Sequence, residues 1–213
     1  MSKLRRGRRK YYDLFSYFYD AFIRLHARQD EDDTRHFLVD AAHLEKRTIS
    51  SILDICCGTG SVIFAFAERH PDAILVGYDF SRGMLRKARE KDLIGRAVFV
   101  EGDAAELPFA DESFDRVTCS HALYELKRRA RERALLEMRR VLCPDGLVLL
   151  MEHEVPRHPI VRLLFYLRLF SAGFGDAREF LFAGGVERLK KIFSWVAVSH
   201  SPSGKSRLMI CRK

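Results

Sequence analysis

The spacing of hydrophobic positions changes near residue 50, from helical intervals to short runs separated by polar segments. Over residues 11–48 the spacing predicts helices, and the first of them carries four aromatic residues on one face: Tyr11, Phe15, Phe18 and Phe22. A polar stretch over residues 29–35 predicts a break before a second helix, which ends near Lys46. We therefore expect an N-terminal helical extension.

From residue 50 onward, short apolar runs alternate with helical segments. The runs predict strands over residues 51–55, 74–78, 97–100, 114–120, 147–152, 196–200 and 207–211. Helices are expected over residues 62–70, from Ser81 onward, and over residues 128–142, 159–170 and 185–193. Pro144, Asp145 and Gly146 predict a turn before the strand at 147–152. This alternation is typical of an α/β fold with a Rossmann-like doubly wound sheet.

The length of 213 residues suits one compact domain with an extension, and 47% hydrophobic and 31% charged residues are ordinary globular values. We place a basic tail and a helical lid in residues 1–48, and a cofactor-binding domain in residues 49–213. The net charge is +8, but six cations fall within the first ten residues, which leaves +2 for the rest. The charge indicates a basic tail, so no nucleic-acid partner is expected.

The five cysteines form no C-x-x-C pair, which argues against a disulfide framework and favours a reducing, cytoplasmic setting. Asp13 and Asp20 interrupt the segment that follows the basic start, so no signal peptide is predicted. The longest apolar stretch covers residues 160–170 and is broken by Arg162 and Arg168, which makes it too short to span a bilayer.

Gly58-Thr59-Gly60 follows the predicted strand at 51–55 and precedes a helix, which is the arrangement of a nucleotide-cofactor turn. Glycines let the backbone approach a ligand, and the start of the helix offers free N–H groups. The loop does not match a dinucleotide fingerprint, because the third glycine of G-x-G-x-x-G would fall at Ile63.

Three aspartates lie at or just beyond the ends of successive predicted strands: Asp54, Asp79 and Asp103. Asp79 suits a ribose, because a carboxylate accepts hydrogen bonds from both hydroxyls. Asp54 beside the loop repels a pyrophosphate and favours a ligand with ammonium and sulfonium groups, while Asp103 suits an adenine amino group. The set favours S-adenosylmethionine over a dinucleotide, whereas any one aspartate alone is equally compatible with capping a turn.

Four segments in this order and spacing resemble class I S-adenosylmethionine-dependent methyltransferases: ILDICCGTG, GYDFSRGMLRKARE, EGDAAELPFADESFDRVTCSHAL and EMRRVLCPDGLVLLMEH. The chain is most similar to the group that C-methylates ubiquinone and menaquinone precursors. The resemblance covers residues 50–153 and implies a seven-stranded sheet with a reversed last strand. By matching positions it implies cofactor contacts from Thr59, Asp79, Asp103, Ala104 and Ser120. It also implies that Asp54, Gly58 and Gly60 shape the loop, and that Phe80 and Met84 pack near the ribose and adenine.

The chain departs from the family pattern at two places. Cys56 stands where the wider D-x-G-x-G-x-G pattern has its first glycine. Tyr124-Glu125 stands where the quinone enzymes usually carry an Arg-Asn pair, which puts a quinone substrate in doubt but leaves cofactor binding intact.

Methyl transfer needs alignment of the acceptor and exclusion of water, because the cofactor supplies the reactive methyl group. A base is needed only if the acceptor arrives protonated, and His121 beside Ser120 is the candidate, with simple packing in the site wall as the alternative. Glu152, His153 and Glu154 follow the fifth strand as a second polar cluster, and we expect them to be solvated loop residues. No metal ligands are assigned.

These features predict a methyltransferase that acts on a small, lipophilic acceptor resembling a quinone precursor. The alternatives are a phospholipid N-methyltransferase and a cofactor-binding regulator without turnover. An RNA methyltransferase is disfavoured, because no Asn-Pro-Pro-Tyr-type sequence follows the fourth strand. The basic tail suits contact with an anionic membrane, although it is equally suited to be a solubilising tail.

Overall fold

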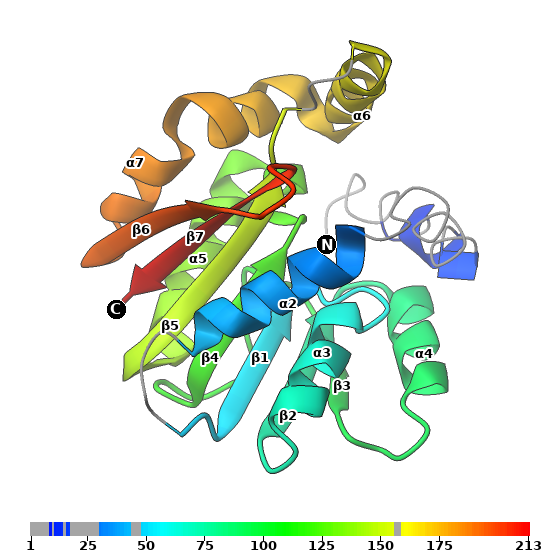
Figure 1. The fold of residues 1–213 in the computed structure, drawn as a ribbon, viewed down its shortest axis with the longest axis vertical. Helices are drawn as coiled ribbons and strands as arrows, with labels where there is room; N and C mark the ends of the chain where they lie inside the picture. Colours follow the sequence, from blue (N-terminus) through cyan, green and yellow to red (C-terminus); the bar gives the residue numbers. More distant parts are fainter. Residues whose placement is uncertain (1–8, 10, 15, 18–29, 44–47, 156–158) are drawn as a thin grey trace.

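The computed structural model describes residues 9, 11–14, 16–17, 30–43, 48–155 and 159–213. The strands are β1 (Ser51–Ile55), β2 (Ile74–Asp79), β3 (Val98–Glu101), β4 (Phe114–Ser120), β5 (Leu142–His153), β6 (Trp195–His200) and β7 (Ser206–Arg212). The helices are α2 (Asp30–Ala42), α3 (Ser61–Arg69), α4 (Arg82–Lys91), α5 (Arg128–Val141), α6 (Pro159–Arg178) and α7 (Gly185–Lys190). A 3-10 turn, η1 (Leu123–Glu125), and a π-helical turn, η2 (Glu179–Gly184), complete the set shown in Figure 1.

The strands form one seven-stranded sheet in the order β3-β2-β1-β4-β5-β7-β6. Strands β1 to β5 pair in parallel, whereas β7 runs antiparallel to both β5 and β6. The predicted doubly wound sheet with a reversed last strand is therefore confirmed. Because β1 to β4 are parallel, the segments that follow them meet at one edge of the sheet, where ligands bind in open α/β folds.

Hydrophobic side chains fill both faces of the sheet. Along β1, Leu53 and Ile55 point to the face covered by α5, η2 and α7, while Ile52 points to the face covered by α2, α3 and α4. Burial on both faces explains why the central strands read as continuous apolar runs. Residues of α2 belong to the second core, so this part of the predicted N-terminal extension packs into the domain.

The predicted break over residues 29–35 is wrong, because α2 begins at Asp30 and continues through this polar stretch. Its sequence starts with DEDD, and negative charge is favourable at a helix N-terminus, so a polar start does not prevent a helix. The aromatic positions Phe15, Phe18 and Phe22, and most of the basic tail, lie outside the described residues.

The predicted turn at Pro144–Gly146 is also wrong, because β5 runs through it from Leu142. The register between β4 and β5 shifts between Phe114 and Arg116, as in a β-bulge, which accommodates the extra residues. A Cβ on Gly146 would lie 2.7 Å from the Leu142 side chain and 2.9 Å from the Asp115 carbonyl oxygen, so only glycine fits where β5 approaches β4 at this position.

Helix α6 is longer than the predicted 159–170 and runs to Arg178. It packs against η1, beyond the carboxyl end of the parallel strands (Figure 1). Within the described part of the chain, no helix has the length and apolar character needed to cross a membrane.

Candidate cofactor and acceptor site

The loop between β1 and α3 makes a tight turn with three residues in the left-handed region. Cys56, Gly58 and Gly60 have φ values of 58°, 55° and 83°. Glycine adopts this conformation without strain, and Cys56 adopts it despite its side chain. A Cβ on Gly58 would meet no atom within 4 Å, so a ligand can approach the backbone there.

Asp79, the last residue of β2, ties this loop to the next one. Its Oδ2 accepts a hydrogen bond from the Gly58 N–H at 3.0 Å, and its Oδ1 accepts one from the Ser81 N–H at 2.8 Å. Burial raises the pKa of Asp79 to about 6, although these hydrogen bonds oppose the rise. Each oxygen keeps a second lone pair, so the carboxylate can still accept from ribose hydroxyls.

Asp54 lies one strand away, in β1, and is also buried. Its Oδ1 accepts a hydrogen bond from the Thr118 hydroxyl of β4 at 2.7 Å. Burial raises the pKa of Asp54 to about 7, and the nearby charge of Asp79 adds to the rise. Two carboxyl groups that are costly to ionise side by side are poised to receive a cation.

The other predicted cofactor residues lie at the same edge of the sheet. Asp103 follows β3, and its Oδ1 accepts a hydrogen bond from the Ala105 N–H at 3.1 Å. Met84 is buried in the first turn of α4, where Ser81 caps the helix by accepting from the Met84 N–H at 3.2 Å. Ala104 and Thr59 are buried, while Phe80 and Ser120 are partly exposed.

The described N-terminal residues contact the residues at this edge of the sheet. The sequence predicted a lid here but not which residues would make the contacts. Asp13 accepts hydrogen bonds from the Ser81 hydroxyl at 2.7 Å and from the Gly83 N–H at 2.9 Å. The Tyr12 ring packs edge-on against Phe80 at 5.7 Å between ring centres. Further along the edge, Arg9 pairs with Glu101 at the end of β3, and the Tyr12 hydroxyl donates to Glu125 in η1.

His121, directly after β4, is fixed by several contacts at this edge. Its φ of 52° lies in the left-handed region, and its N–H donates to the Met151 carbonyl at 2.7 Å. The ring nitrogens Nδ1 and Nε2 each lie 3.0 Å from a serine hydroxyl, of Ser120 and Ser206 respectively. The ring also stacks on His153, with 4.1 Å between ring centres. These contacts suit both the base role and the wall role predicted for it.

Glu152 is not the solvated loop residue that the sequence predicts, because it is fully buried at the end of β5. Burial raises its pKa to about 8. The burial of Glu152 could not be predicted from the polar residues next to it, because the segments that cover its carboxyl lie far away in the sequence. Glu154, two residues later, is partly exposed and lies 3.4 Å from His200 and 3.8 Å from Arg207.

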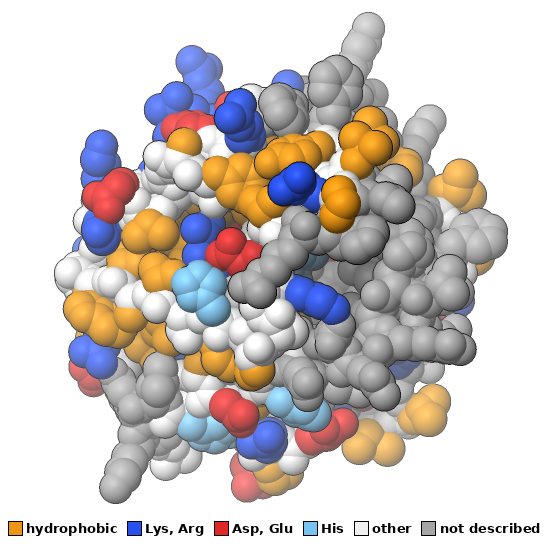
Figure 2. Space-filling view, turned by 45° about the horizontal axis from the view of Figure 1, so that its top comes forward, with side chains coloured by type: hydrophobic (Ala, Val, Ile, Leu, Met, Phe, Trp, Pro, Cys, Tyr) orange, Lys and Arg blue, Asp and Glu red, His pale blue; other side chains and the backbone are white. Residues whose placement is uncertain are grey.

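Figure 2 shows the end of the molecule that carries α6, where hydrophobic and cationic side chains lie side by side. Leu163, Leu167 and Phe182 are exposed apolar residues of α6 and η2. On the inner side, Phe165 packs edge-on against His153 at 6.0 Å between ring centres. Apolar and aromatic groups thus lie beside His153 at this edge of the sheet.

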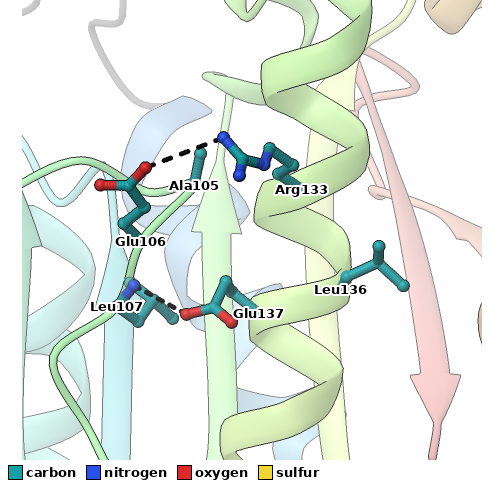
Figure 3. Close-up of a pocket in the computed structure, with 6 residues that line it drawn as sticks. All are labelled: Ala105, Glu106, Leu107, Arg133, Leu136 and Glu137. Carbon is teal, nitrogen blue, oxygen red and sulfur yellow. Dashed lines mark hydrogen bonds and ion pairs between the residues drawn. The ribbon is translucent and has the colours of Figure 1, made fainter. Parts of the chain in front are cut away.

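A separate open pocket of about 470 Å³ lies between α5 and the segment after Ala104 (Figure 3). Glu106 and Arg133 pair across it at 3.7 Å, and Glu137 accepts from the Leu107 N–H at 2.8 Å. Glu106 and Arg133 are thus paired with each other, Glu137 is paired with Arg140, and none of the predicted cofactor residues lines the pocket.

Comparison with known proteins agrees with this geometry. Residues 52–146 match a family described as a methyltransferase domain. The chain is 43% identical over 110 residues to a demethylmenaquinone methyltransferase of Roseiflexus, covering 52% of this chain and 45% of the relative. It is 36% identical over 158 residues to the Staphylococcus aureus protein of the same name, covering 66% of this chain and 64% of the relative. The chain thus spans about half to two thirds of these curated relatives.

Solved structures share the fold at low sequence identity. A chain from the structure of a complex that contains the Haloferax volcanii Trm112 methyltransferase activator superposes with a TM-score of 0.70 at 15% identity, covering 94% of this chain and 96% of its own. A TehB-like S-adenosylmethionine-dependent methyltransferase from Corynebacterium glutamicum gives 0.66 at 17% identity, covering 94% and 98%. Residues 52–146 therefore match a methyltransferase domain, and the chain has the fold of S-adenosylmethionine-dependent methyltransferases of known structure.

Proposed function

We propose that this chain transfers a methyl group from S-adenosylmethionine to a small, lipophilic acceptor. The observation that carries the cofactor assignment is the pair of buried carboxyls, Asp54 and Asp79, beside a loop that presents open backbone at Gly58. When bound, S-adenosylmethionine supplies an electrophilic methyl group on a sulfonium. The site fits this ligand because carboxylates favour its positive charge and would repel a pyrophosphate.

We propose individual cofactor contacts from the positions of the side chains. We assign the ribose hydroxyls to Asp79, which ends β2, and the adenine amino group to Asp103, which follows the neighbouring parallel strand β3 at the same edge. Phe80 and Met84 supply apolar contact beside them. Asp54 stabilises positive charge near Gly58, Thr59 and Gly60, while Ala104 and Ser120 line the remaining wall.

A lipophilic acceptor is supported by the aromatic and apolar groups under α6 and by relatives named demethylmenaquinone methyltransferases. Tyr124 and Glu125 occupy the place of the expected Arg-Asn pair and contact each other, with 3.1 Å between the Tyr124 hydroxyl and Glu125 Oε1. We therefore propose a quinone-precursor-like acceptor class without naming one quinone. His121 is the candidate base if the acceptor arrives protonated.

The described residues between 9 and 17 form part of a lid in this proposal. They contact Glu101 at the end of β3 and residues that follow β2 and β4, so they span the cofactor edge and exclude water from it. For the cationic tail, most of which lies outside the described residues, we propose weak, salt-dependent contact with anionic membrane. Sedimentation with anionic and neutral liposomes, before and after removal of residues 1–10, separates this contact from a solubilising tail.

The test of the proposed function is a labelling experiment. Purified protein is incubated with S-adenosylmethionine carrying a deuterated methyl group and with a lipid extract of cells, and products are identified by mass spectrometry. We expect label in a quinone-like, lipid-soluble product. Label in phospholipid headgroups would instead support a phospholipid N-methyltransferase. Binding of S-adenosylhomocysteine without any labelled product would support a regulator without turnover.

A further inference from the structure

The carboxyl of Glu152 caps a turn that belongs to another part of the sheet. Its Oε1 accepts a hydrogen bond from the Tyr124 N–H at 3.2 Å, and the Leu123 N–H also interacts with the carboxyl. These N–H groups belong to η1, and Ala122, the residue just before η1, provides no capping side chain. A free N–H at the start of a helical turn needs an acceptor, and here it comes from β5.

Contacts continue from η1 to the N-terminal segment. The Tyr124 hydroxyl donates to Glu125 Oε1 at 3.1 Å, and the Tyr12 hydroxyl donates to the other oxygen of Glu125. Tyr12 in turn packs on Phe80 at the cofactor edge. A continuous set of contacts thus joins the buried end of β5 to the residues that cross the site.

The surroundings of Glu152 are poor in compensating charge. Arg131 of α5 is fully buried, but its Nη2 donates to the Asp176 carbonyl at 3.0 Å and its guanidinium lies 4.5 Å from the centre of the Phe180 ring. Within the described chain, Arg131 Nε and Nη1 and Glu152 Oε2 have no hydrogen-bond partner, so no hydrogen bond joins the two side chains.

Four ionisable groups neighbour Glu152, and two of them, Glu125 and Arg131, act on its charge. Glu125 raises its pKa and Arg131 lowers it, the Cys119 thiol is close enough to be affected by it, and His153 is the next residue of β5. Burial outweighs these effects and raises the pKa of Glu152 to about 8. The carboxyl is therefore mostly protonated at neutral pH, and ionisation would place a second negative charge near Glu125.

We propose that Glu152 is a positioning residue for methyl transfer, which caps η1 and thereby holds Glu125 and Tyr12 in place over the acceptor side. The inference rests on the proposed function for its effect on catalysis, but not for the contacts themselves. A neutral group with one accepting oxygen is sufficient for this role, so glutamine should replace Glu152. Alanine should not, because it leaves the N–H groups of η1 without an acceptor.

The test compares Glu152→Gln and Glu152→Ala with Glu154→Gln as the matched control from the same strand end. For Glu152→Ala we expect KM to rise about tenfold or more for the acceptor that receives the deuterated methyl group in the labelling experiment. The affinity for S-adenosylhomocysteine should stay within about twofold of wild type. Hydrogen exchange should become faster in peptides covering both 123–125 and 11–14. We expect wild-type activity to decline above about pH 8, where Glu152 ionises, and Glu152→Gln should retain most activity without this decline.

Three results would overturn the proposal: Glu152→Ala behaving like Glu154→Gln, glutamine being as harmful as alanine, or faster exchange confined to β5. If Glu152→Ala does not fold, the pH profile and exchange of Glu152→Gln decide in its place, and an unchanged alkaline decline counts against the proposal. Exchange and S-adenosylhomocysteine affinity require no acceptor. They therefore separate failure of this positioning role from failure of the proposed function.

Discussion

The carboxylate of Asp79 accepts a hydrogen bond of 3.0 Å from the backbone N–H of Gly58, which lies in the loop between β1 and α3. The same carboxylate accepts from Ser81 at the start of α4. One side chain thus sets the distance between the glycine loop and the end of β2, where a ribose would lie. Its contribution to binding includes loop order as well as any direct contact with the ligand.

Asp79→Asn should weaken S-adenosylhomocysteine binding by about 1–3 kcal/mol, because it removes a charge-assisted acceptor while keeping one carbonyl oxygen for the loop. Isothermal titration calorimetry measures the change. Asp72→Asn, an exposed turn residue, is the control and should bind like wild type. Unchanged affinity in a folded Asp79→Asn variant would remove Asp79 from the site.

Thr118→Val should weaken S-adenosylmethionine binding near neutral pH. Burial raises the pKa of Asp54 to about 7, and the hydrogen bond from the Thr118 hydroxyl opposes this rise. Removal of the hydroxyl should therefore raise the pKa of Asp54 further. Fewer molecules then carry the Asp54 carboxylate, whose negative charge favours a cationic ligand. The loss should be smaller at about pH 9, where Asp54 ionises in both proteins. Thr118→Ser keeps the hydroxyl and should behave like wild type; an equal loss at all pH values would contradict the explanation.

The free energy of unfolding of the ligand-free protein should fall as pH rises from about 4 to about 8, because three buried carboxyls ionise over this range. Their pKa values in the folded state are about 6 for Asp79, about 7 for Asp54 and about 8 for Glu152, above the ordinary values of 3.8 for Asp and 4.5 for Glu. The folded state therefore holds more protons than the unfolded state in this window, and the stabilisation is lost as pH rises. Denaturant unfolding of wild type and Glu152→Gln should show a flatter decline in the variant. Matching slopes for the two proteins would count against the assignment to Glu152.

Asp13→Ala should loosen the N-terminal segment and destabilise the start of α4. The variant loses hydrogen bonds to Ser81 and Gly83, and loss of such a cap costs about 1 kcal/mol. Limited proteolysis and hydrogen exchange over residues 11–17 report the change, with Asp72→Ala as the control. Equal protection in both variants would show that Asp13 does not hold the segment.

Local pattern predicted the parts of the fold that depend on neighbouring residues. The buried run at 114–120 is β4 residue for residue, and Ser81 caps α4 as expected, because burial and capping are visible within a few positions. The strand at Pro144–Gly146 was not predictable, because a bulge permits turn-forming residues within a strand only when the partner strand shifts in register.

For the candidate site, local features predicted which of these residues lie close together, but not every contact among them. Glycines and strand-end aspartates are local features, so the loop residues and Asp79 fall together as expected. The contacts of Asp13 and Glu152 were missed, because Asp13 binds a helix about seventy positions away and Glu152 is buried by η1, which follows a different strand. Contacts between segments so far apart leave no periodic signal in the sequence.

Calorimetric titration of the purified protein with S-adenosylhomocysteine and, separately, with NAD tests the cofactor assignment most directly. The two buried carboxyls and the missing third glycine at Ile63 predict saturable binding of S-adenosylhomocysteine at one site and no measurable binding of NAD. Tighter binding of NAD than of S-adenosylhomocysteine would contradict the account.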